Sequence, residues 1–83
     1  MKSTIIDVRM PKEYSLGHLK DSINIPMGEI PNRIEEIKSL AEPRILVCAS
    51  GNRSGQVTRF LNQSGVICEN GGSWMDVNMK DYV

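Results

Sequence analysis

A short segment in the middle of the chain contains the residue types needed for covalent chemistry on sulfur. The segment CASGNRS, residues 48–54, directly follows the apolar run ILV. Gly51 can adopt positive φ, and the small residues beside it let the backbone coil until successive N–H groups converge near the Cys48 sulfur. A helix that begins after this loop would add the positive end of its dipole, and Arg53 would add a full positive charge.

These surroundings favour the thiolate form of Cys48. A free cysteine has a pKa of about 8.5, and helix N-termini with cationic neighbours lower it to roughly 3.5 to 7.5. Cys48 would then be a nucleophile at neutral pH without a histidine base, and the same N–H groups would stabilise an anion bonded to its sulfur. The alternative is a small buried apolar residue, as unpaired cysteines often are. The composition of the loop favours the nucleophile.

The spacing from cysteine to arginine limits the group that the loop can hold. Cysteine phosphatases use the pattern Cys-x5-Arg, in which the ring of N–H groups surrounds three phosphate oxygens. Here four residues separate Cys48 from Arg53. The smaller ring is better matched to a single terminal sulfur, as in a persulfide, so a cysteine phosphatase or arsenate reductase is the less favoured alternative.

The second cysteine is expected to have a packing role. Cys68 lies in the run VICEN, and a disulfide with Cys48 would need Cα atoms within about 7 Å of each other. A position in the middle of a strand, below the loop, would not allow that. With a single histidine, His18, and no CxxC pair, the chain has neither a disulfide framework nor a zinc-site pattern, and we expect no metal.

Four short runs rich in Ile and Val predict strands, and they span residues 4–8, 22–25, 45–48 and 66–70. Strands that alternate with helical segments favour a parallel sheet. We therefore expect a minimal α/β fold, a small mostly parallel sheet of four to five strands flanked by helices on both faces, in a single domain over residues 1–83. Such sheets bind ligands beyond the C-terminal ends of their strands, where Cys48 would lie.

Helical spacing appears in the segments between the expected strands. Residues 30, 34 and 37 are all Ile, and Pro31 suits a first helical turn, so one helix with a single buried face is expected there. After the third strand, the apolar positions 57, 60 and 61 predict a second helix that ends at Gly65. A shorter helical turn is expected at 11–14.

Composition and charge exclude several classes of partner. The 83 residues are 40% hydrophobic, and ten Lys and Arg balance ten Asp and Glu, so we expect no attraction to nucleic acid or to an anionic membrane. No run approaches the roughly 18 apolar residues of a membrane span, and the N-terminus lacks the pattern of a signal peptide. A cytoplasmic protein is expected, or a periplasmic one if a leader has been removed.

Four motifs along nearly the whole chain together resemble one family. They are IIDVR at 5–9 followed by Glu13 and Tyr14, GHLKDSINIP at 17–26, CASGNR at 48–53 and GGSW at 71–74. Each is weak alone, but in this order and with these gaps the chain resembles a single-domain rhodanese, a thiosulfate sulfurtransferase similar in size to the short phage-shock type.

The resemblance implies a ping-pong reaction. The Cys48 thiolate would take the outer sulfur of thiosulfate or another sulfane donor, hold it as a persulfide, and pass it to a thiophile such as cyanide or a thiol. Arg53 would close the loop and pair with the sulfonate of thiosulfate. No metal or organic cofactor is implied, because sulfur itself is the carried group. The other residues of the persulfide-binding loop would be Ala49, Ser50, Gly51, Asn52 and Ser54, the first four acting mainly through their backbones.

The implied partners are small sulfur donors and thiol acceptors, or a protein that donates or accepts persulfide sulfur. Many relatives carry a basic residue directly after the cysteine, where this chain has Ala49, so a weaker hold on thiosulfate is expected. The chain also has little before the DVR motif and little after the double glycine, which would expose a sheet edge. We expect a monomer or a weak dimer.

The resemblance also implies structural roles for residues outside the loop. The GH position is structural in the family, so His18 is expected to fix a loop by hydrogen bonding and not to act as a general base. Asp7, Arg9 and Glu13 could form an acid–base cluster, but an ion pair between Arg9 and Glu13 that anchors the first turn is the favoured interpretation.

The segment after the double glycine leaves two alternatives open. Trp74 and Met75 either fill the core or border the mouth of the active site, as this segment does in relatives. A second open question is whether the chain is a catalytically silent rhodanese-like binding module. Such modules commonly lose the cysteine, which this chain keeps.

Overall fold

The structure is a computed structural model that describes residues 3–77. All the paired strands run parallel, in the sheet order β2-β1-β3-β4. This arrangement confirms the expected small parallel α/β fold. In chain order the elements are β1 (Thr4–Asp7), α1 (Pro11–Ser15), β2 (Ile23–Asn24), the 3₁₀ helix η1 (Met27–Arg33), α2 (Ile34–Lys38), β3 (Arg44–Cys48), α3 (Asn52–Gln63) and β4 (Glu69–Ser73).

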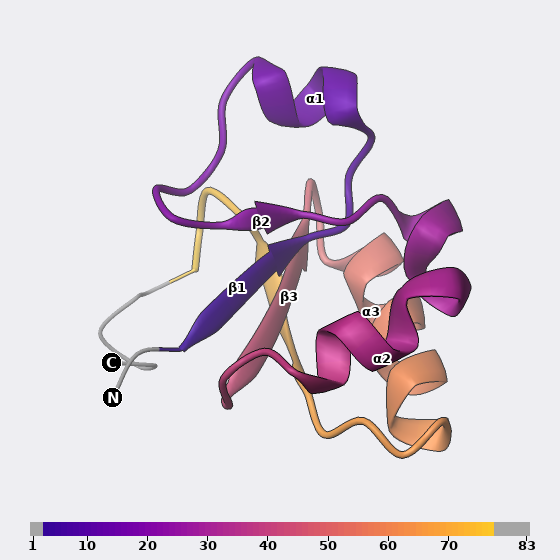
Figure 1. Cartoon of the computed structure of the whole chain (residues 1–83). Helices are drawn as coiled ribbons and strands as arrows, with labels where there is room; N and C mark the ends of the chain where they lie inside the picture. The colour runs from indigo at the N-terminus through magenta and orange to yellow at the C-terminus, as the bar shows by residue number, and fades with distance from the viewer. Residues whose placement is uncertain (1–2, 78–83) are drawn as a thin grey trace.

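The two faces of the sheet are covered differently. Figure 1 shows α2 and α3 on one side of the sheet, with α1 standing beyond the C-terminal ends of the strands. The main core lies on the α2–α3 side and includes Ile37 and Leu61. The other face carries a small cluster of Ile5, Ile45 and Val47. Among the described residues, helices therefore cover one face and not the expected two. The second cluster is packed by Leu19, Trp74 and Val77, which lie outside the helices.

The helix expected around Ile30 to Ile37 is divided in two. It begins as η1, with Pro31 inside it, and becomes α-helical only at Ile34. Proline has no N–H and its ring crowds the preceding turn, which accounts for a tighter 3₁₀ start. Ile30 and Ile37 are buried as expected, so the change in helix type preserves the buried face.

The long helix α3 follows the expected pattern with one difference. It ends at Gln63, and Gly65 has a φ of +86°, as expected of a glycine that stops a helix. Val57 and Leu61 are buried, whereas Phe60 is 39% exposed. Among the described residues, no helix is long and apolar enough to cross a membrane.

The fourth strand lies three residues later than expected. Val66 and Cys68 are buried in the core but lie before the strand. The backbone that pairs with β3 is that of Glu69–Ser73. A Cβ at Gly71 would lie 2.6 Å from Ile45 Cγ2, so only glycine permits this close approach. The position of β4 is therefore set by strand pairing and not by β-propensity. Cys68 lies just before the strand, whereas it was expected in the middle of one.

Candidate active site

Cys48 occupies the C-terminal end of β3, one of the two inner strands of the sheet. Its carbonyl accepts a hydrogen bond from the Trp74 N–H at 2.9 Å, which extends the pairing with β4. The chain then turns through Gly51, whose φ is +96°, and enters α3 at Asn52. A Cβ at Gly51 would lie 3.1 Å from Gly72 Cα. Glycine is therefore required here both for its φ and for the close contact.

Hydrogen-bond donors converge on the Cys48 sulfur, and we call them the cradle. The N–H of Gly51 lies 3.0 Å from Sγ, and the N–H and the hydroxyl of Ser54 each lie 3.4 Å from it. The N–H of Ser50 also acts on the thiol. The N–H of Asn52 donates to Ser50 Oγ instead. The cradle is therefore built from Ser50, Gly51 and Ser54, with Ser54 contributing twice.

The cradle determines the ionisation of Cys48. Burial is the largest single effect and raises the pKa of the thiol, because it disfavours the charged form. The Ser54 hydroxyl and the N–H groups of Ser54, Ser50 and Gly51 act in the opposite direction and together outweigh burial, so the pKa of Cys48 lies below its ordinary value. Hydrogen bonds to the thiolate are thus the main source of its stabilisation.

The Cys48 residue has no exposed surface in this conformation. Its sulfur lies under its own loop and the start of α3. The sulfur is thus enclosed by the loop that donates hydrogen bonds to it.

Arg53 is joined to a residue far away in the sequence. Its Nη1 and Nη2 lie 2.8 and 2.9 Å from the two carboxylate oxygens of Glu13. The Arg53 hydrogen bonds, together with the N–H of Met10, lower the pKa of Glu13 to about 2. This pair links α1 to the start of α3, and closure of the loop by Arg53 stays a prediction.

Arg9 does not pair with the Glu13 carboxylate, and the expected ion pair is wrong. Its Nε and Nη2 instead bind the Asp7 carboxylate, with an Nη2–Oδ2 distance of 2.8 Å, and both residues are buried. Nη2 also donates to the Gly17 carbonyl at 2.7 Å, and the guanidinium lies 4.7 Å from the centre of the Trp74 ring. Arg9 therefore fastens the end of β1 to the segment around Gly17.

His18 contacts Tyr14, and Trp74 in the segment after β4 contacts the second cluster. His18 is exposed, its Nδ1 is 2.7 Å from the Tyr14 carbonyl, and its ring stacks on Tyr14 with centroids 3.7 Å apart. Trp74 is half-buried against the second cluster, whereas Met75 is 72% exposed. The Trp74 ring acts as a plug for that cluster, and contact of either residue with a substrate stays a prediction.

Sequence reasoning missed Asn70 as a residue of the site. Its Oδ1 accepts from Ser54 Oγ at 2.6 Å and from the Gly72 N–H at 3.0 Å, and its Nδ2 donates to the Gly51 carbonyl at 3.1 Å. Asn70 pairs with Leu46, and the register of the β3–β4 pairing shifts directly after it, at Gly71. The double glycine of the GGSW motif marks that position in the sequence, but nothing in the motif indicates Asn70 as a site residue.

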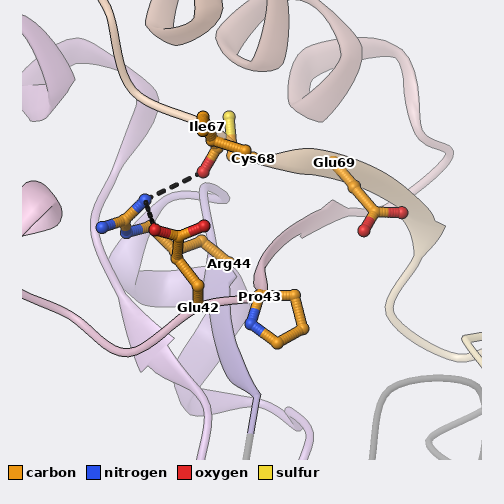
Figure 2. A pocket seen from close by; sticks show the side chains of 6 residues that line it. All are labelled: Glu42, Pro43, Arg44, Ile67, Cys68 and Glu69. Carbon is orange, nitrogen blue, oxygen red and sulfur yellow. Dashed lines mark hydrogen bonds and ion pairs between the residues drawn. The ribbon is translucent and has the colours of Figure 1, made fainter.

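The second thiol lies at the opposite end of the sheet. Cys68 lines a pocket of about 290 Å³ beside Arg44, the first residue of β3, whereas Cys48 is the last. In Figure 2 the Arg44 guanidinium points to the Ile67 carbonyl and to Glu42, at 2.9 and 3.9 Å. Burial raises the pKa of Cys68, and the charge of Arg44 only partly offsets this. Cys68 is thus the less readily ionised of the two.

Comparison with known proteins assigns the chain to one family. The family model described as a rhodanese-like domain matches residues 1–79. The chain belongs to the rhodanese-like domain family. A solved Escherichia coli structure described as a rhodanese with anions is similar to this chain, with 33% identity, 93% of each chain covered and a TM-score of 0.81.

Two relatives of this rhodanese-like chain are named for their activities. The thiosulfate sulfurtransferase PspE of Escherichia coli K12 is 36% identical over 76 residues, which cover 89% of this chain and 73% of the relative. The thiosulfate:glutathione sulfurtransferase of Saccharomyces cerevisiae is 33% identical over 74% of this chain, which spans only 52% of the relative. Relatives of this kind support sulfurtransferase activity in general.

Proposed function

We propose that this protein is a sulfurtransferase that carries a sulfane sulfur on Cys48, from thiosulfate or a persulfide donor to a thiophilic acceptor such as cyanide or a thiol. The observation that carries the proposal is the cradle of N–H and O–H donors around one buried sulfur, with a Gly51 N–Sγ distance of 3.0 Å. The named sulfurtransferase relatives support the same reaction class.

In the first half-reaction the Cys48 thiolate attacks the outer sulfur of the donor. A bond forms between Sγ and that sulfur, and the donor's own S–S bond breaks. Its electron pair leaves with sulfite when thiosulfate is the donor, or with the thiolate when a persulfide is the donor. The negative charge then resides on the new terminal sulfur, which the cradle donors stabilise as they stabilise the thiolate.

In the second half-reaction the acceptor attacks the terminal sulfur of the Cys48 persulfide. Cyanide forms thiocyanate, or a thiolate forms a new persulfide, and the electron pair of the broken S–S bond returns to Sγ. Cys48 returns to its thiolate, and the cycle needs no oxidant other than the sulfane sulfur itself. The lowered pKa of Cys48 serves both half-reactions, because a stabilised thiolate is a nucleophile in the first and a good leaving group in the second.

The pairing of Arg53 with Glu13 bears on the choice of donor. Both ends of the Arg53 guanidinium are engaged, at 2.8 and 2.9 Å, so thiosulfate would have to compete with the Glu13 carboxylate for that charge. A persulfide has one negative charge and a single terminal sulfur. The closed loop and the paired arginine therefore favour persulfide donors over thiosulfate.

The test is transfer of sulfur from thiosulfate and from glutathione persulfide to cyanide, followed as thiocyanate. We expect both donors to work in the wild-type protein, with the larger kcat/KM for the persulfide. Cys48→Ser should reduce transfer to the uncatalysed rate, and the matched variant Cys68→Ser should retain it. Full activity of Cys48→Ser would refute the proposal.

The burial of Cys48, at 0% exposure, is the one observation that favours a non-catalytic binding module. If Cys48 stays unlabelled by every sulfane donor while the fold is intact, the binding module is the better interpretation.

A further inference from the structure

The Ser54 hydroxyl has two acceptors but only one proton. Its Oγ lies 2.6 Å from Asn70 Oδ1 and 3.4 Å from Cys48 Sγ. A serine hydroxyl donates one hydrogen bond at a time. Ser54 has no exposed surface, so these two atoms compete for that proton.

The orientation of the Asn70 amide follows from its other two partners. The Gly72 N–H donates to Oδ1 at 3.0 Å, and Nδ2 donates to the Gly51 carbonyl at 3.1 Å. Exchanging the oxygen and nitrogen would place a donor against the Gly72 N–H and an acceptor against the Gly51 carbonyl. The atom that faces Ser54 is therefore an acceptor oxygen.

The protonation state of the Cys48 sulfur decides which of the two acceptors the Ser54 hydroxyl donates to. When Cys48 is a thiol, its sulfur is a weak acceptor, and the 2.6 Å contact with Asn70 holds the Ser54 proton. When Cys48 ionises, its proton leaves to solvent and the charged sulfur becomes the stronger acceptor. Rotation about the Ser54 Cβ–Oγ bond then moves the hydroxyl proton towards Sγ, without breaking the O–H bond.

We propose that Asn70 is a positioning residue that competes with the Cys48 sulfur for the single Ser54 proton and thereby sets how strongly the cradle holds the ionised sulfur. Its importance for turnover rests on the proposed function. The anion at the cradle changes position each time sulfur is bound or released. Whenever the sulfur does not accept the Ser54 hydroxyl, that hydroxyl donates to Asn70 Oδ1 instead.

The charged groups around the cradle are paired and are not part of this competition. Arg53 of α3 pairs with Glu13 of α1 at 2.8 Å. On the β1 side, Arg9 pairs with Asp7 at 2.8 Å. Changes at Asn70 or Ser54 leave these pairs in place, so the expected effects on Cys48 come from hydrogen bonding.

Removal of Asn70 should leave the backbone of the loop in place. The Gly51 carbonyl, which Asn70 contacts, also accepts from the Gly55 N–H at 3.0 Å inside α3. The two N–H donors of Gly51 and Ser54 are fixed by the turn into that helix. The loss of Asn70 therefore acts mainly on the Ser54 proton.

The test is a double-mutant cycle on the ionisation of Cys48. The thiolate absorbance is titrated with pH for the wild type, Ser54→Ala, Asn70→Ala and the double variant, with Cys48→Ser subtracted. We expect Ser54→Ala to lower the ionisation constant of Cys48 about tenfold, since it removes a hydrogen bond to a charge. Asn70→Ala should raise this constant roughly threefold to fivefold when Ser54 is present, and should not raise it in the Ser54→Ala background.

A lower constant in Asn70→Ala, or an equal change with and without Ser54, would show a purely structural Asn70 and overturn the proposal. Far-ultraviolet circular dichroism confirms that each variant is folded. If the double variant unfolds, Asn70→Asp replaces it. A carboxylate accepts the Ser54 hydrogen bond more strongly than an amide does. Asn70→Asp should therefore lower the ionisation constant of Cys48 by more when Ser54 is present than in the Ser54→Ala background. An equal fall in both backgrounds would count against the proposal.

The titration needs no sulfur transfer, so its outcome is separate from that of the proposed function. Sulfur transfer by Cys48 together with an additive cycle would refute only the role of Asn70. A coupled cycle in a protein that accepts no sulfur from any donor would support Asn70 and refute the sulfurtransferase.

Discussion

Hydrogen-bond donors, and not a neighbouring base, lower the pKa of Cys48. The donors are close, with the Gly51 N–H at 3.0 Å from the sulfur, and they belong to the backbone and to one hydroxyl. Histidine takes no part, because His18 is exposed and bound to the Tyr14 carbonyl at 2.7 Å. A site of this kind depends on local geometry more than on the pKa of any other side chain.

The Arg53–Glu13 pair gives a prediction about that geometry. Arg53→Lys keeps the charge but loses the two parallel hydrogen bonds to Glu13. We expect the loop to be less well fixed and kcat/KM for sulfur transfer to fall about tenfold, the equivalent of one charged hydrogen bond.

The chain offers a matched control for this substitution. Arg33 also binds a carboxylate through two nitrogens, at 2.8 Å to each oxygen of Glu36, but on the exposed side of η1 and α2. Arg33→Lys should leave kcat/KM unchanged. Equal losses in both variants would mean that Arg53 has no special role at the loop.

The arrangement of the Cys48 loop was predictable from residue types, because the loop is local. Cys48, Gly51 and Arg53 lie within six positions, and a strand followed by a helix dictates their arrangement. The partners of Arg53 and Arg9 were not predictable. Several carboxylates of similar type are available, and the fold brings Glu13 of α1 to Arg53 while Arg9 pairs with its near neighbour Asp7.

The junction of β3 and α3 is the element on which the site depends. Gly51 forms the turn between β3 and α3 with a φ of +96°, and it lies against the Gly72 backbone. Any side chain at this position would have to adopt an unfavourable φ and displace β4.

Gly51→Ala should therefore lower both stability and activity. We expect a loss of about 1–2 kcal/mol from the left-handed backbone alone, and more from the contact with Gly72. Urea denaturation and thiocyanate formation measure the two effects. Gly28→Ala is the control, because no atom lies within 4 Å of a Cβ at Gly28, and it should leave both quantities unchanged.

The helices and strands were predicted with unequal success. Helix α3 has strong periodicity and a clear glycine stop, so its bounds were close to those observed, Asn52–Gln63. β4 has the sequence ENGGS, which has little β-propensity. Its position comes from pairing with β3 and from the close approach at Gly71, and a single sequence does not display either.

In the part of the chain that the structure describes, an ion pair between Arg53 and Glu13 links α1 to the start of α3, beside the Cys48 loop. Glu13 and Arg53 are 40 positions apart, and their contact holds α1 over the C-terminal ends of the strands. The folded-state pKa of Glu13 is lowered from 4.5 to about 2. The contribution of Glu13 to stability is therefore fully present above the unfolded pKa and is lost as the pH falls towards about 2.

This linkage predicts how acid affects the protein. The difference in stability between the wild type and Glu13→Gln should be constant above pH 4.5 and should shrink as the pH falls towards about 2. Chemical denaturation at several pH values measures it. Both groups are partly exposed, so the difference should be small and should weaken with salt. A difference that grows on acidification would contradict the assigned pairing.

The most direct test of Cys48 as the sulfur carrier is a single-turnover experiment without an acceptor. The protein is mixed with glutathione persulfide at neutral pH, and peptide mass spectrometry locates any added sulfur. We expect one sulfur atom on Cys48 and none on Cys68, with release of that sulfur when cyanide is added. Sulfur on Cys68, or turnover to cyanide with no sulfur ever found on Cys48, would contradict the account.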